Sequence, residues 1–305
     1  MIKSIAICSR SFSSNKLLVK NLNNKFEKVK LNSDGLSLSK KSLINFLIGY
    51  ESTIIGLEEI SEEVVKNLPD LKIISKYGVG IDKIDIEALK KYDIEFRYTP
   101  GVNKRSVAEL VLSFTLSLLR NTFNLHKEVV NGKWKQNLGS ELTGLKFGIL
   151  GFGHVGQDLY KLLNPFNCQI LFHDKYNVVS ENKLLKAKKV DLQRLFSDSD
   201  IISIHVPLND QTRNMISHKL LKLMKPNAIL INTARGGIVN EEDLFQCLKH
   251  KRISSAAFDV LSTEPPVNNK LLHLNNFFVT PHIGSSTMQA INAMGLAAID
   301  GILKD

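Results

Sequence analysis

The sequence predicts an α/β protein made of two domains, each a doubly wound parallel sheet with helices on both faces. Three observations support this. Short apolar segments alternate with amphipathic helical segments almost from end to end. One long helical stretch beginning near residue 104 interrupts the alternation, which then restarts. The 305 residues, 43% of them hydrophobic, provide enough apolar mass for two cores.

The first third of the chain supplies the first sheet. We expect strands near residues 2–8, 53–56, 72–75 and 94–98, with helices near 62–67 and 86–91. A helical stretch from Lys104 to Val130 follows, with an apolar face and a stop signal at Asn131-Gly132. This long helix is expected to join the domains or to form an interface.

The second sheet follows the long helix. Its expected strands are 146–150, 169–172, 201–204, 228–231, 255–258 and 277–279. Near the end of the chain, Ser286 and Gln289 have capping-box spacing ahead of an apolar helical face. We therefore expect a last helix that packs back on the first domain, giving domains of 1–101 with 283–305, and 102–282.

Composition and charge exclude several function classes. Lys and Arg exceed Asp and Glu by 40 to 30, but they are scattered and lack an aromatic platform, so we expect no nucleic-acid partner. No apolar run approaches the roughly 18 residues of a membrane span. The apolar stretch 5–8 is too short for a secretory signal, so the mature protein should begin near Met1. Cys8, Cys168 and Cys247 lack metal-site or disulfide spacing, which predicts no metal and a cytoplasmic location.

A glycine motif directly follows the predicted strand 146–150. It reads Gly151-Phe152-Gly153-His154-Val155-Gly156 and opens a helix. In a dinucleotide-binding turn, the first glycine permits a tight turn, the second lets a pyrophosphate approach the backbone, and the third lets helix and strand pack closely. The helix amino terminus adds N–H donors. We therefore predict a Rossmann domain whose cofactor contacts include Gly151, Gly153, His154, Val155 and Gly156.

The next predicted strand runs into Asp174, about 20 residues beyond the glycines. A carboxylate there can accept hydrogen bonds from ribose hydroxyls and would repel a 2′-phosphate, so we expect NAD rather than NADP. Lys175 weakens this choice, because a cation could attract that phosphate. The alternative is that Asp174 is a surface residue that caps the following turn.

Three charged or titratable residues lie where strands of the second sheet are expected to end: Arg235, Glu264 and His282. Ligand sites of parallel sheets lie at this edge. Each residue has a structural alternative: His282 could cap a loop, Arg235 could pair with a helix end, and Glu264 could be solvated beside its prolines. Together, and next to a cofactor motif, they favour a catalytic site.

The segments that carry these residues resemble the D-isomer-specific 2-hydroxyacid dehydrogenases, a family that includes phosphoglycerate dehydrogenase. The resembling segments are Lys76-Tyr77-Gly78-Val79-Gly80-Ile81-Asp82, residues 103–109, the glycine motif, His205-Val206-Pro207-Leu208, and residues 231–237, 258–266 and 280–284. The resemblance covers nearly the whole chain. It implies a flavodoxin-like substrate domain beside the Rossmann domain, and NAD-dependent hydride transfer that interconverts a D-2-hydroxy acid and its 2-keto acid.

The resemblance also implies roles for single residues. His282 is expected to be the general acid/base at the substrate oxygen. Glu264 is expected to accept the other imidazole N–H, which fixes the tautomer and favours the protonated ring. Arg235 is expected to bind the substrate carboxylate through two parallel hydrogen bonds. Further matches are the substrate-side positions Val79, Gly80 and Asn103 and the cofactor-side positions His205, Pro207, Thr233 and Asp259.

The substrate itself stays open at this point. Phosphoglycerate is one alternative, yet residues 56–60 read Gly-Leu-Glu-Glu-Ile, where phosphoglycerate dehydrogenases often carry arginines. Acidic residues there would disfavour a dianionic phosphate. Lys76, Lys104 or Arg105 could supply the missing charge. The chain ends at Asp305, and we expect no regulatory extension.

Two further expectations concern partners. The family's habit and the apolar face of the 104–130 helix predict a homodimer through that helix and the loop that holds Trp134. A different class of function is a dinucleotide-sensing corepressor that uses this fold to bind a protein. The association of such a binding module with its partner would depend on whether NADH is bound, and the module would turn over no keto acid.

Overall fold

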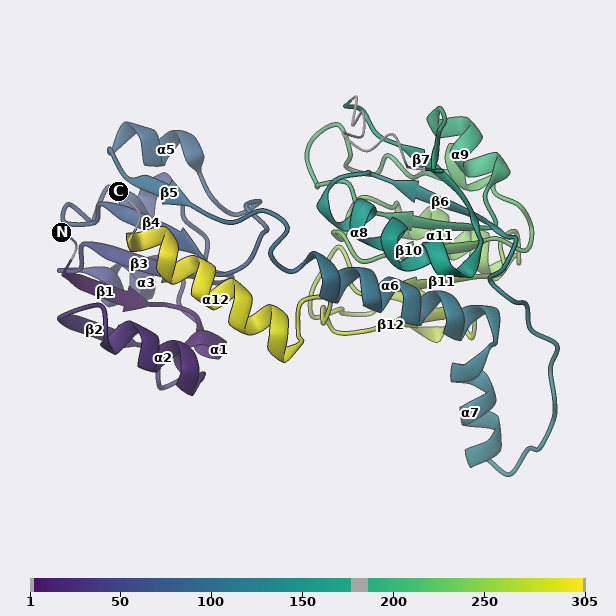
Figure 1. Ribbon diagram of the computed structural model, residues 1–305, viewed down its shortest axis with the longest axis horizontal. Coiled ribbons are helices and arrows are strands. Elements are labelled where there is room, and N and C mark those ends of the chain that lie inside the picture. Colours follow the sequence, from purple (N-terminus) through teal and green to yellow (C-terminus); the bar gives the residue numbers. More distant parts are fainter. Residues whose placement is uncertain (1–2, 177–185, 304–305) are drawn as a thin grey trace. The chain divides into compact units, whose positions relative to one another are not determined.

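The computed structural model describes residues 3–176 and 186–303, which divide into two compact units (Figure 1). One unit is Met1–Asn103 with Ser286–Asp305, and the other is Lys104–Ser285. Residues 283–285 thus belong to the second unit rather than the first. The reason is a pair of hydrogen bonds: Gly284 N donates to Asp259 Oδ2 at 2.7 Å, and Ser106 Oγ donates to Gly284 O at 2.7 Å.

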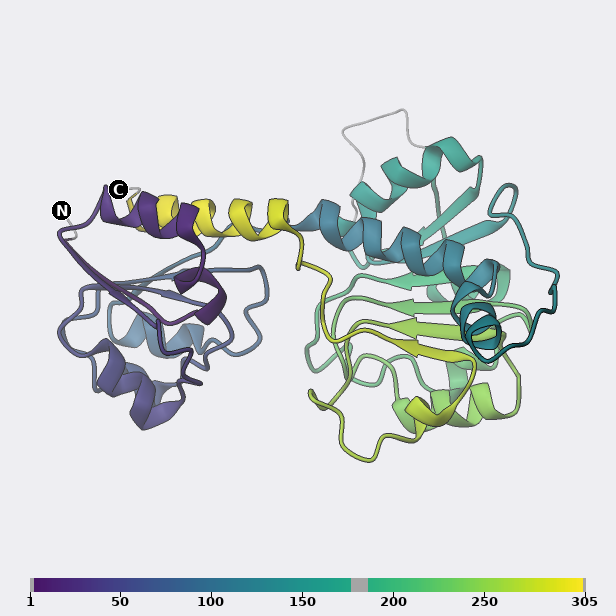
Figure 2. The same cartoon turned by 90° about the horizontal axis from the view of Figure 1, so that it is seen from below.

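The first unit is a five-stranded parallel sheet in the order β2-β1-β3-β4-β5. Its strands are β1 Ser4–Ile7, β2 Lys28–Leu31, β3 Ser52–Ile55, β4 Ile73–Lys76 and β5 Glu95–Arg97. Helices α3 Lys40–Leu47, α4 Glu62–Val65 and α5 Ile86–Lys91 cover one face. Helices α1 Arg10–Ser13, α2 Lys16–Asn23 and α12 Met288–Leu303 cover the other, where α2 and α12 run side by side (Figure 2).

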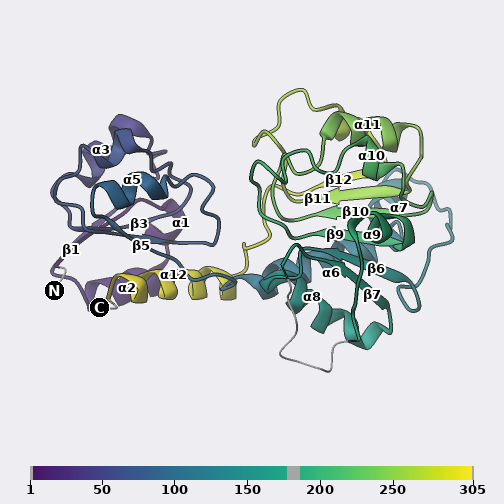
Figure 3. The same cartoon turned by 90° about the horizontal axis from the view of Figure 1, so that it is seen from above.

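The second unit is a seven-stranded parallel sheet in the order β12-β11-β10-β9-β6-β7-β8. Its strands are β6 Lys146–Leu150, β7 Gln169–His173, β8 Lys188–Lys189, β9 Ile201–Ile204, β10 Ile229–Asn232, β11 Ser255–Phe258 and β12 Phe277–Val279. Helices α6 Lys104–Leu119 and α8 His154–Leu163 lie on one face, and α9 Leu192–Asp198, α10 His218–Leu221 and α11 Glu241–Lys249 lie on the other (Figure 3). Helix α7 is Thr122–Val130, and short 3-10 turns span Asn164–Phe166 and Lys270–His273.

The strand order of the second unit positions its functional edge. From β6 the chain builds outward through β7 and β8, then returns to the other side of β6 for β9 to β12. The order therefore reverses between β6 and β9. Because all these strands are parallel, their carboxyl ends share one edge, and such a reversal point is where doubly wound sheets open a crevice for ligands.

Three sequence-based expectations need correction or qualification. The long helix 104–130 is two helices, because Asn121 takes a left-handed conformation with φ 53° that ends α6 and starts α7. The last helix is capped by Thr287 Oγ1, which accepts from Ala290 N at 3.2 Å, rather than by the expected Ser286 box. The first strand was expected from residue 2, which lies outside the described residues.

The last helix packs in the first unit, as expected, with Met294, Ala298 and Ile299 in the same core as Ile5 and Leu18. Across residues 3–176 and 186–303, no helix combines the length and the apolar character that a membrane crossing needs.

Candidate active site and dinucleotide site

The glycine motif forms the turn between β6 and α8. Gly151 has φ 92°, and a Cβ there would lie 2.7 Å from the backbone carbonyl of His205, so only glycine fits. A Cβ on Gly156 would run into Gly151 O, so the third glycine is needed for the close approach of helix and strand. At Gly153, by contrast, a Cβ would meet nothing within 4 Å. The second glycine therefore faces open space, as a pyrophosphate needs.

The start of α8 completes this cradle. Gly153 is its N-cap and, lacking a side chain, offers no cap to the first N–H groups, which include those of His154 and Val155. These donors and the helix dipole favour an anion at this point. The turn thus has the features that a dinucleotide pyrophosphate requires.

Asp174 directly follows β7 and is tied to the glycine turn. Its Oδ2 accepts from Phe152 N at 2.7 Å, and its Oδ1 accepts from Tyr176 N at 2.9 Å. Asp174 thus caps the following turn, as the structural alternative expects. Its carboxylate also lies beside the glycine motif. Each oxygen retains a second lone pair for a ribose hydroxyl, a role that stays a prediction.

His205 follows β9 and packs under the same turn. Its backbone N donates to Leu150 O at 2.6 Å, and its Nε2 lies 2.8 Å from Ser203 Oγ. Burial lowers the pKa of His205 to about 3, so the ring is neutral at physiological pH. The nearby Pro207 is exposed, and its carbonyl accepts from Thr212 Oγ1 at 2.6 Å.

The predicted acid/base pair is present at the carboxyl ends of β11 and β12. His282 Nδ1 lies 2.8 Å from Glu264 Oε2, while Glu264 Oε1 accepts from Leu261 N at 3.0 Å. An ionised carboxylate can only accept, so Nδ1 carries the hydrogen and Nε2 is left for other chemistry. The side chains of His282 and Glu264 are 43% and 38% exposed, so a small molecule can reach them.

Asp259 directly follows β11 and is a buried hydrogen-bond acceptor for the loop that carries His282. It is 1% exposed, and its Oδ1 accepts from Thr280 Oγ1 at 2.5 Å and from Ile283 N at 2.7 Å. Its Oδ2 accepts from Gly284 N at 2.7 Å, and its carbonyl accepts from His282 N at 2.9 Å. Asp259 therefore shapes this loop, and its expected contact with the nicotinamide stays a prediction.

Arg235 lies one strand away, in the loop after β10. Its Nη1 donates to Ala234 O at 2.7 Å, and its carbonyl accepts from Asn232 Nδ2 at 2.9 Å. The next residue, Gly236, packs so closely on Leu261 O that a Cβ could not fit. Since Leu261 also binds Glu264, this contact sets the Arg235 loop against the Glu264 loop.

Two predicted site residues have buried polar atoms without a hydrogen-bond partner in the described chain. They are Thr233 Oγ1, in the second unit, and Asn103 Oδ1, in the first. Orphaned polar atoms are costly, so such groups in a folded protein call for an explanation, of which a ligand is one. The other substrate-side positions, Val79 and Gly80, are partly exposed in the loop after β4.

Sequence reasoning missed residues that hold the site from beneath. Asn232 is 1% exposed and uses its side chain to bind both Ala234 N and Arg235 O. The hydroxyl of Ser203 contacts Nε2 of His205 and so orients that ring. Both are polar residues in otherwise apolar buried strands, and that pattern is the signal that could have found them.

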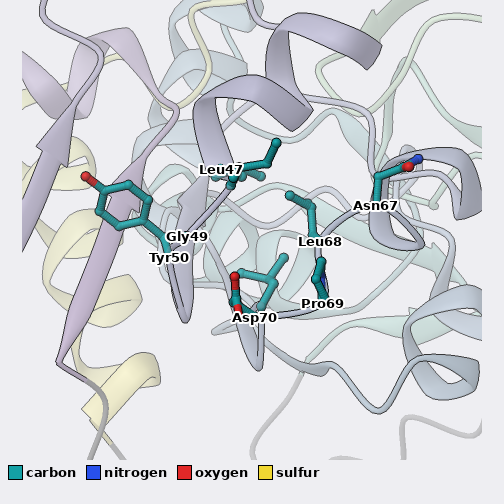
Figure 4. Close-up of a pocket in the computed structure, with 9 residues that line it drawn as sticks. Leu47, Gly49, Tyr50, Asn67, Leu68, Pro69 and Asp70 are labelled. Carbon is teal, nitrogen blue, oxygen red and sulfur yellow. The ribbon is translucent and has the colours of Figure 1, made fainter.

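A cavity in the first unit lies away from these residues. It encloses about 260 Å³ and is lined by residues 47–50 and 67–71, several of which are drawn in Figure 4. These residues precede β3 and β4, at the amino ends of the strands. Parallel sheets bind ligands at their carboxyl ends, and this cavity contains none of the predicted site residues.

Comparison with known proteins agrees with this geometry. Residues 112–284 match the family model described as the NAD binding domain of D-isomer specific 2-hydroxyacid dehydrogenases. A glyoxylate reductase from Thermococcus litoralis is 39% identical over 246 residues, covering 78% of this chain and 74% of the relative. A hydroxypyruvate reductase from Thermotoga maritima is 34% identical over 274 residues, covering 88% and 89%.

A solved structure is similar over both units. It is an acyclic imino acid reductase in complex with NADPH and D-Arg, with a TM-score of 0.89 and 27% identity over 98% of this chain and 96% of that one. The family match confirms the predicted fold class and NAD as cofactor. With a model that covers more than half of the chain and relatives matched over most of their length, this chain belongs to the D-isomer-specific 2-hydroxyacid dehydrogenases, NAD-dependent enzymes that interconvert 2-hydroxy acids and 2-keto acids.

Proposed function

We propose that this enzyme reduces a small 2-keto acid to the D-2-hydroxy acid, with NADH bound by the second unit and substrate contacts supplied by the first. The observation that carries the proposal is the 2.8 Å pair of His282 and Glu264, on neighbouring strand ends of the sheet that holds the glycine turn. Relatives named glyoxylate reductase and hydroxypyruvate reductase support a small keto acid.

His282 is the group that moves a proton. Because Glu264 holds Nδ1, the proton exchanged with the substrate oxygen is carried on Nε2. During reduction His282 donates this proton to the keto oxygen, and during oxidation it removes the proton from the hydroxyl. Glu264 stabilises the cationic ring, because its carboxylate lies against the charge that protonation creates.

Arg235 binds the substrate carboxylate. A guanidinium can donate two parallel hydrogen bonds to the two carboxylate oxygens, which fixes the direction of the neighbouring carbonyl. Backbone groups of Val79 and Gly80 and the unpaired Oδ1 of Asn103 are the substrate contacts proposed in the first unit. By binding the carboxylate, Arg235 orients the carbonyl before any bond changes.

The glycine turn, the start of α8 and Asp174 hold the dinucleotide, which supplies the hydride when bound. Thr233, with its buried unpaired hydroxyl, and Asp259 are proposed on the nicotinamide side, and His205 and Pro207 beside them. Asp174 supports NADH over NADPH, because a carboxylate at the ribose repels a 2′-phosphate.

The proposal is tested by NADH oxidation with the purified chain and a panel of keto acids: pyruvate, glyoxylate, hydroxypyruvate, 2-oxoglutarate and 3-phosphohydroxypyruvate, with NADPH in parallel. We expect turnover of at least one unphosphorylated acid with NADH. Binding of NADH without turnover of any member would contradict the proposal and favour the corepressor reading. A pull-down with and without NADH would then seek the partner.

We also propose that the chain forms a homodimer through α7 and the segment after it. Helix α7 has no buried residue and projects from the rest of its unit (Figure 1). Val130, the last residue of α7, is 71% exposed, and the segment after it carries Trp134, which is 87% exposed, and the fully exposed Leu138. Apolar side chains gathered on a projecting arm are typical of an interface.

Light scattering at micromolar concentration tests the dimer, which should be lost when Trp134 and Leu138 are both changed to serine. A monomeric parent chain would exclude it.

We further propose a cytoplasmic location, since Cys8, Cys168 and Cys247 are all unpaired thiols in the described chain.

A further inference from the structure

We propose that Glu241 is a positioning residue for the proton transfer, because it holds the loop that presents Glu264 to His282. The inference rests on the proposed function, in which Glu264 orients the ring of His282 and stabilises its protonated form. All the residues concerned belong to the second unit.

The loop that carries Glu264 has little apolar packing of its own. It is flanked by two core residues, Leu261 and Leu271, which are 5% and 1% exposed. Residues 262–268 between them are all exposed. A cavity of about 260 Å³ is lined by this loop and by the first turn of α11. Polar contacts are therefore needed to fix the position of Glu264.

Glu241 supplies such contacts with both of its carboxylate oxygens. Oε1 accepts from Ser262 N at 2.6 Å, and Oε2 accepts from Asn269 Nδ2 at 2.8 Å. One carboxylate thus bridges the two ends of the loop, and Glu264 lies in the sequence between them. Hydrogen bonds to an ionised acceptor are short and roughly twice as strong as neutral ones, so this bridge fixes the spacing of the loop ends.

Helix α11 is a firm support for this bridge. Glu241 is its first residue, and its Leu244 and Leu248 are almost fully buried in the core of the second unit. The side chain of Asn240 caps the helix by accepting from Asp243 N at 3.0 Å. The helix dipole favours a negative charge in this first turn. The loop is therefore tied to an element that is itself fixed by packing.

The bridge reaches the acid/base pair through a short chain of contacts. Leu261 N, one residue before Ser262, donates to Glu264 Oε1 at 3.0 Å. The other oxygen of Glu264 lies 2.8 Å from His282 Nδ1. Releasing the loop would displace the carboxylate that orients the imidazole. Since catalysis depends on the geometry of the reacting groups, the loss should appear in kcat rather than in dinucleotide binding.

A hydrogen bond of reversed polarity tests the inference. In Glu241→Gln the amide can accept from Ser262 N, but its NH₂ group then faces the NH₂ group of Asn269, so one bond is lost. In Asn269→Asp two carboxylates repel each other. In the double variant the introduced amide can donate to the introduced carboxylate, whose second oxygen can still accept from Leu271 N, as Asn269 Oδ1 does in the parent.

The measurement is NADH oxidation by the full chain with a keto acid that the parent reduces. Each single variant should lower kcat about tenfold, and the double variant should recover to within about threefold of the parent. The Kd for NADH should stay unchanged. In Glu241→Gln the loss of activity at high pH should also begin about half a pH unit lower, because reduction needs the protonated ring and a displaced Glu264 stabilises it less. The charged groups Arg235 and Asp259 are unaltered in every variant.

Glu242→Gln is the matched control. It removes the same charge from the same helix turn, but Glu242 binds Lys270 and Gln246, which lie outside the loop 262–269. We expect parent kcat and an unshifted pH profile. A melting curve for each variant shows whether it is folded, and if a single variant does not fold, recovery in the double variant decides.

The inference is overturned if a folded single variant keeps the kcat of the parent, if Glu242→Gln causes an equal loss, or if the folded double variant recovers no activity. Absence of turnover by the parent on every keto acid would overturn the proposed function and the positioning role together. Failure in an active parent overturns the positioning role alone, so the two cases are distinguishable.

Discussion

Asp259 holds the backbone of His282 and of the two residues after it. Its carbonyl accepts from His282 N, and its carboxylate accepts from Ile283 N and Gly284 N. The φ of 55° at His282 lies in the left-handed region, which non-glycine residues adopt uncommonly, and these hydrogen bonds hold the backbone there. The direction of the imidazole thus depends on a carboxylate that is itself almost fully buried.

We predict that Asp259→Asn lowers kcat by about 10- to 100-fold. An amide would turn an N–H toward one of the backbone donors, and each lost hydrogen bond to a charged group costs roughly 1.5–3 kcal/mol. Steady-state kinetics measure the loss. Asp243→Asn is the control, because Asp243 also accepts a backbone N–H, that of His218, but lies outside the site. An equal loss in both variants would contradict the specific role of Asp259.

His282→Ala should lower turnover by roughly 10²–10⁴, the usual contribution of a positioned acid or base. NADH binding, followed by fluorescence, should change little, because the glycine turn lies at a different strand end. The matched control is His250→Ala, an exposed histidine at the end of α11. Turnover at the parent rate in His282→Ala would remove the acid/base assignment.

The glycine turn predicts opposite effects for two similar substitutions. Gly153→Ala should keep the melting temperature, since its φ of −75° suits alanine and a Cβ meets nothing within 4 Å, but the Kd for NADH should rise roughly tenfold or more. Gly156→Ala should lower the melting temperature by several degrees, because overpacking costs about 1–3 kcal/mol. Calorimetry and NADH titration of both proteins distinguish the two cases, and identical behaviour would refute the reading of the turn.

The pKa of His205 predicts how stability depends on pH. Burial lowers it to about 3, whereas an unfolded histidine titrates near 6.5. Between these values the unfolded chain binds a proton that the folded chain does not, so the free energy of unfolding falls as pH drops from about 6.5 toward 3, by at most about 1.4 kcal/mol per pH unit. Urea unfolding of the parent and of His205→Gln checks this, since the variant should have the smaller slope. If the free energy of unfolding of the two proteins depended on pH with the same slope, the His205 ring would not be buried as a neutral group.

Much of the second unit could be predicted from sequence, because its strands are short apolar runs and its functional residues follow them directly. The strand at Ile201–Ile204 and the glycine turn are local features of this kind. In the first unit the edge strand β2 was not anticipated. Its sequence Lys-Val-Lys-Leu is half polar, so it has none of the apolar run that marks the central strands.

Other differences could not be predicted from local patterns. Asp259 accepts hydrogen bonds from residues 280–284, more than 20 positions along the chain, and nothing local in the sequence shows this. The break of the long helix at Asn121 is likewise invisible to periodicity, since the apolar pattern continues on both sides.

The last helix has a consequence for biosynthesis. Helix α12 supplies Met294, Ala298 and Ile299 to the core of the first unit, although 182 residues of the second unit, Lys104–Ser285, separate it from the rest of that core. On the ribosome the second unit can therefore fold while the first still lacks one wall of its interior. The part of the protein that is translated first is completed last, and until α12 emerges, the apolar face around Ile5 and Leu18 has to be kept from aggregation.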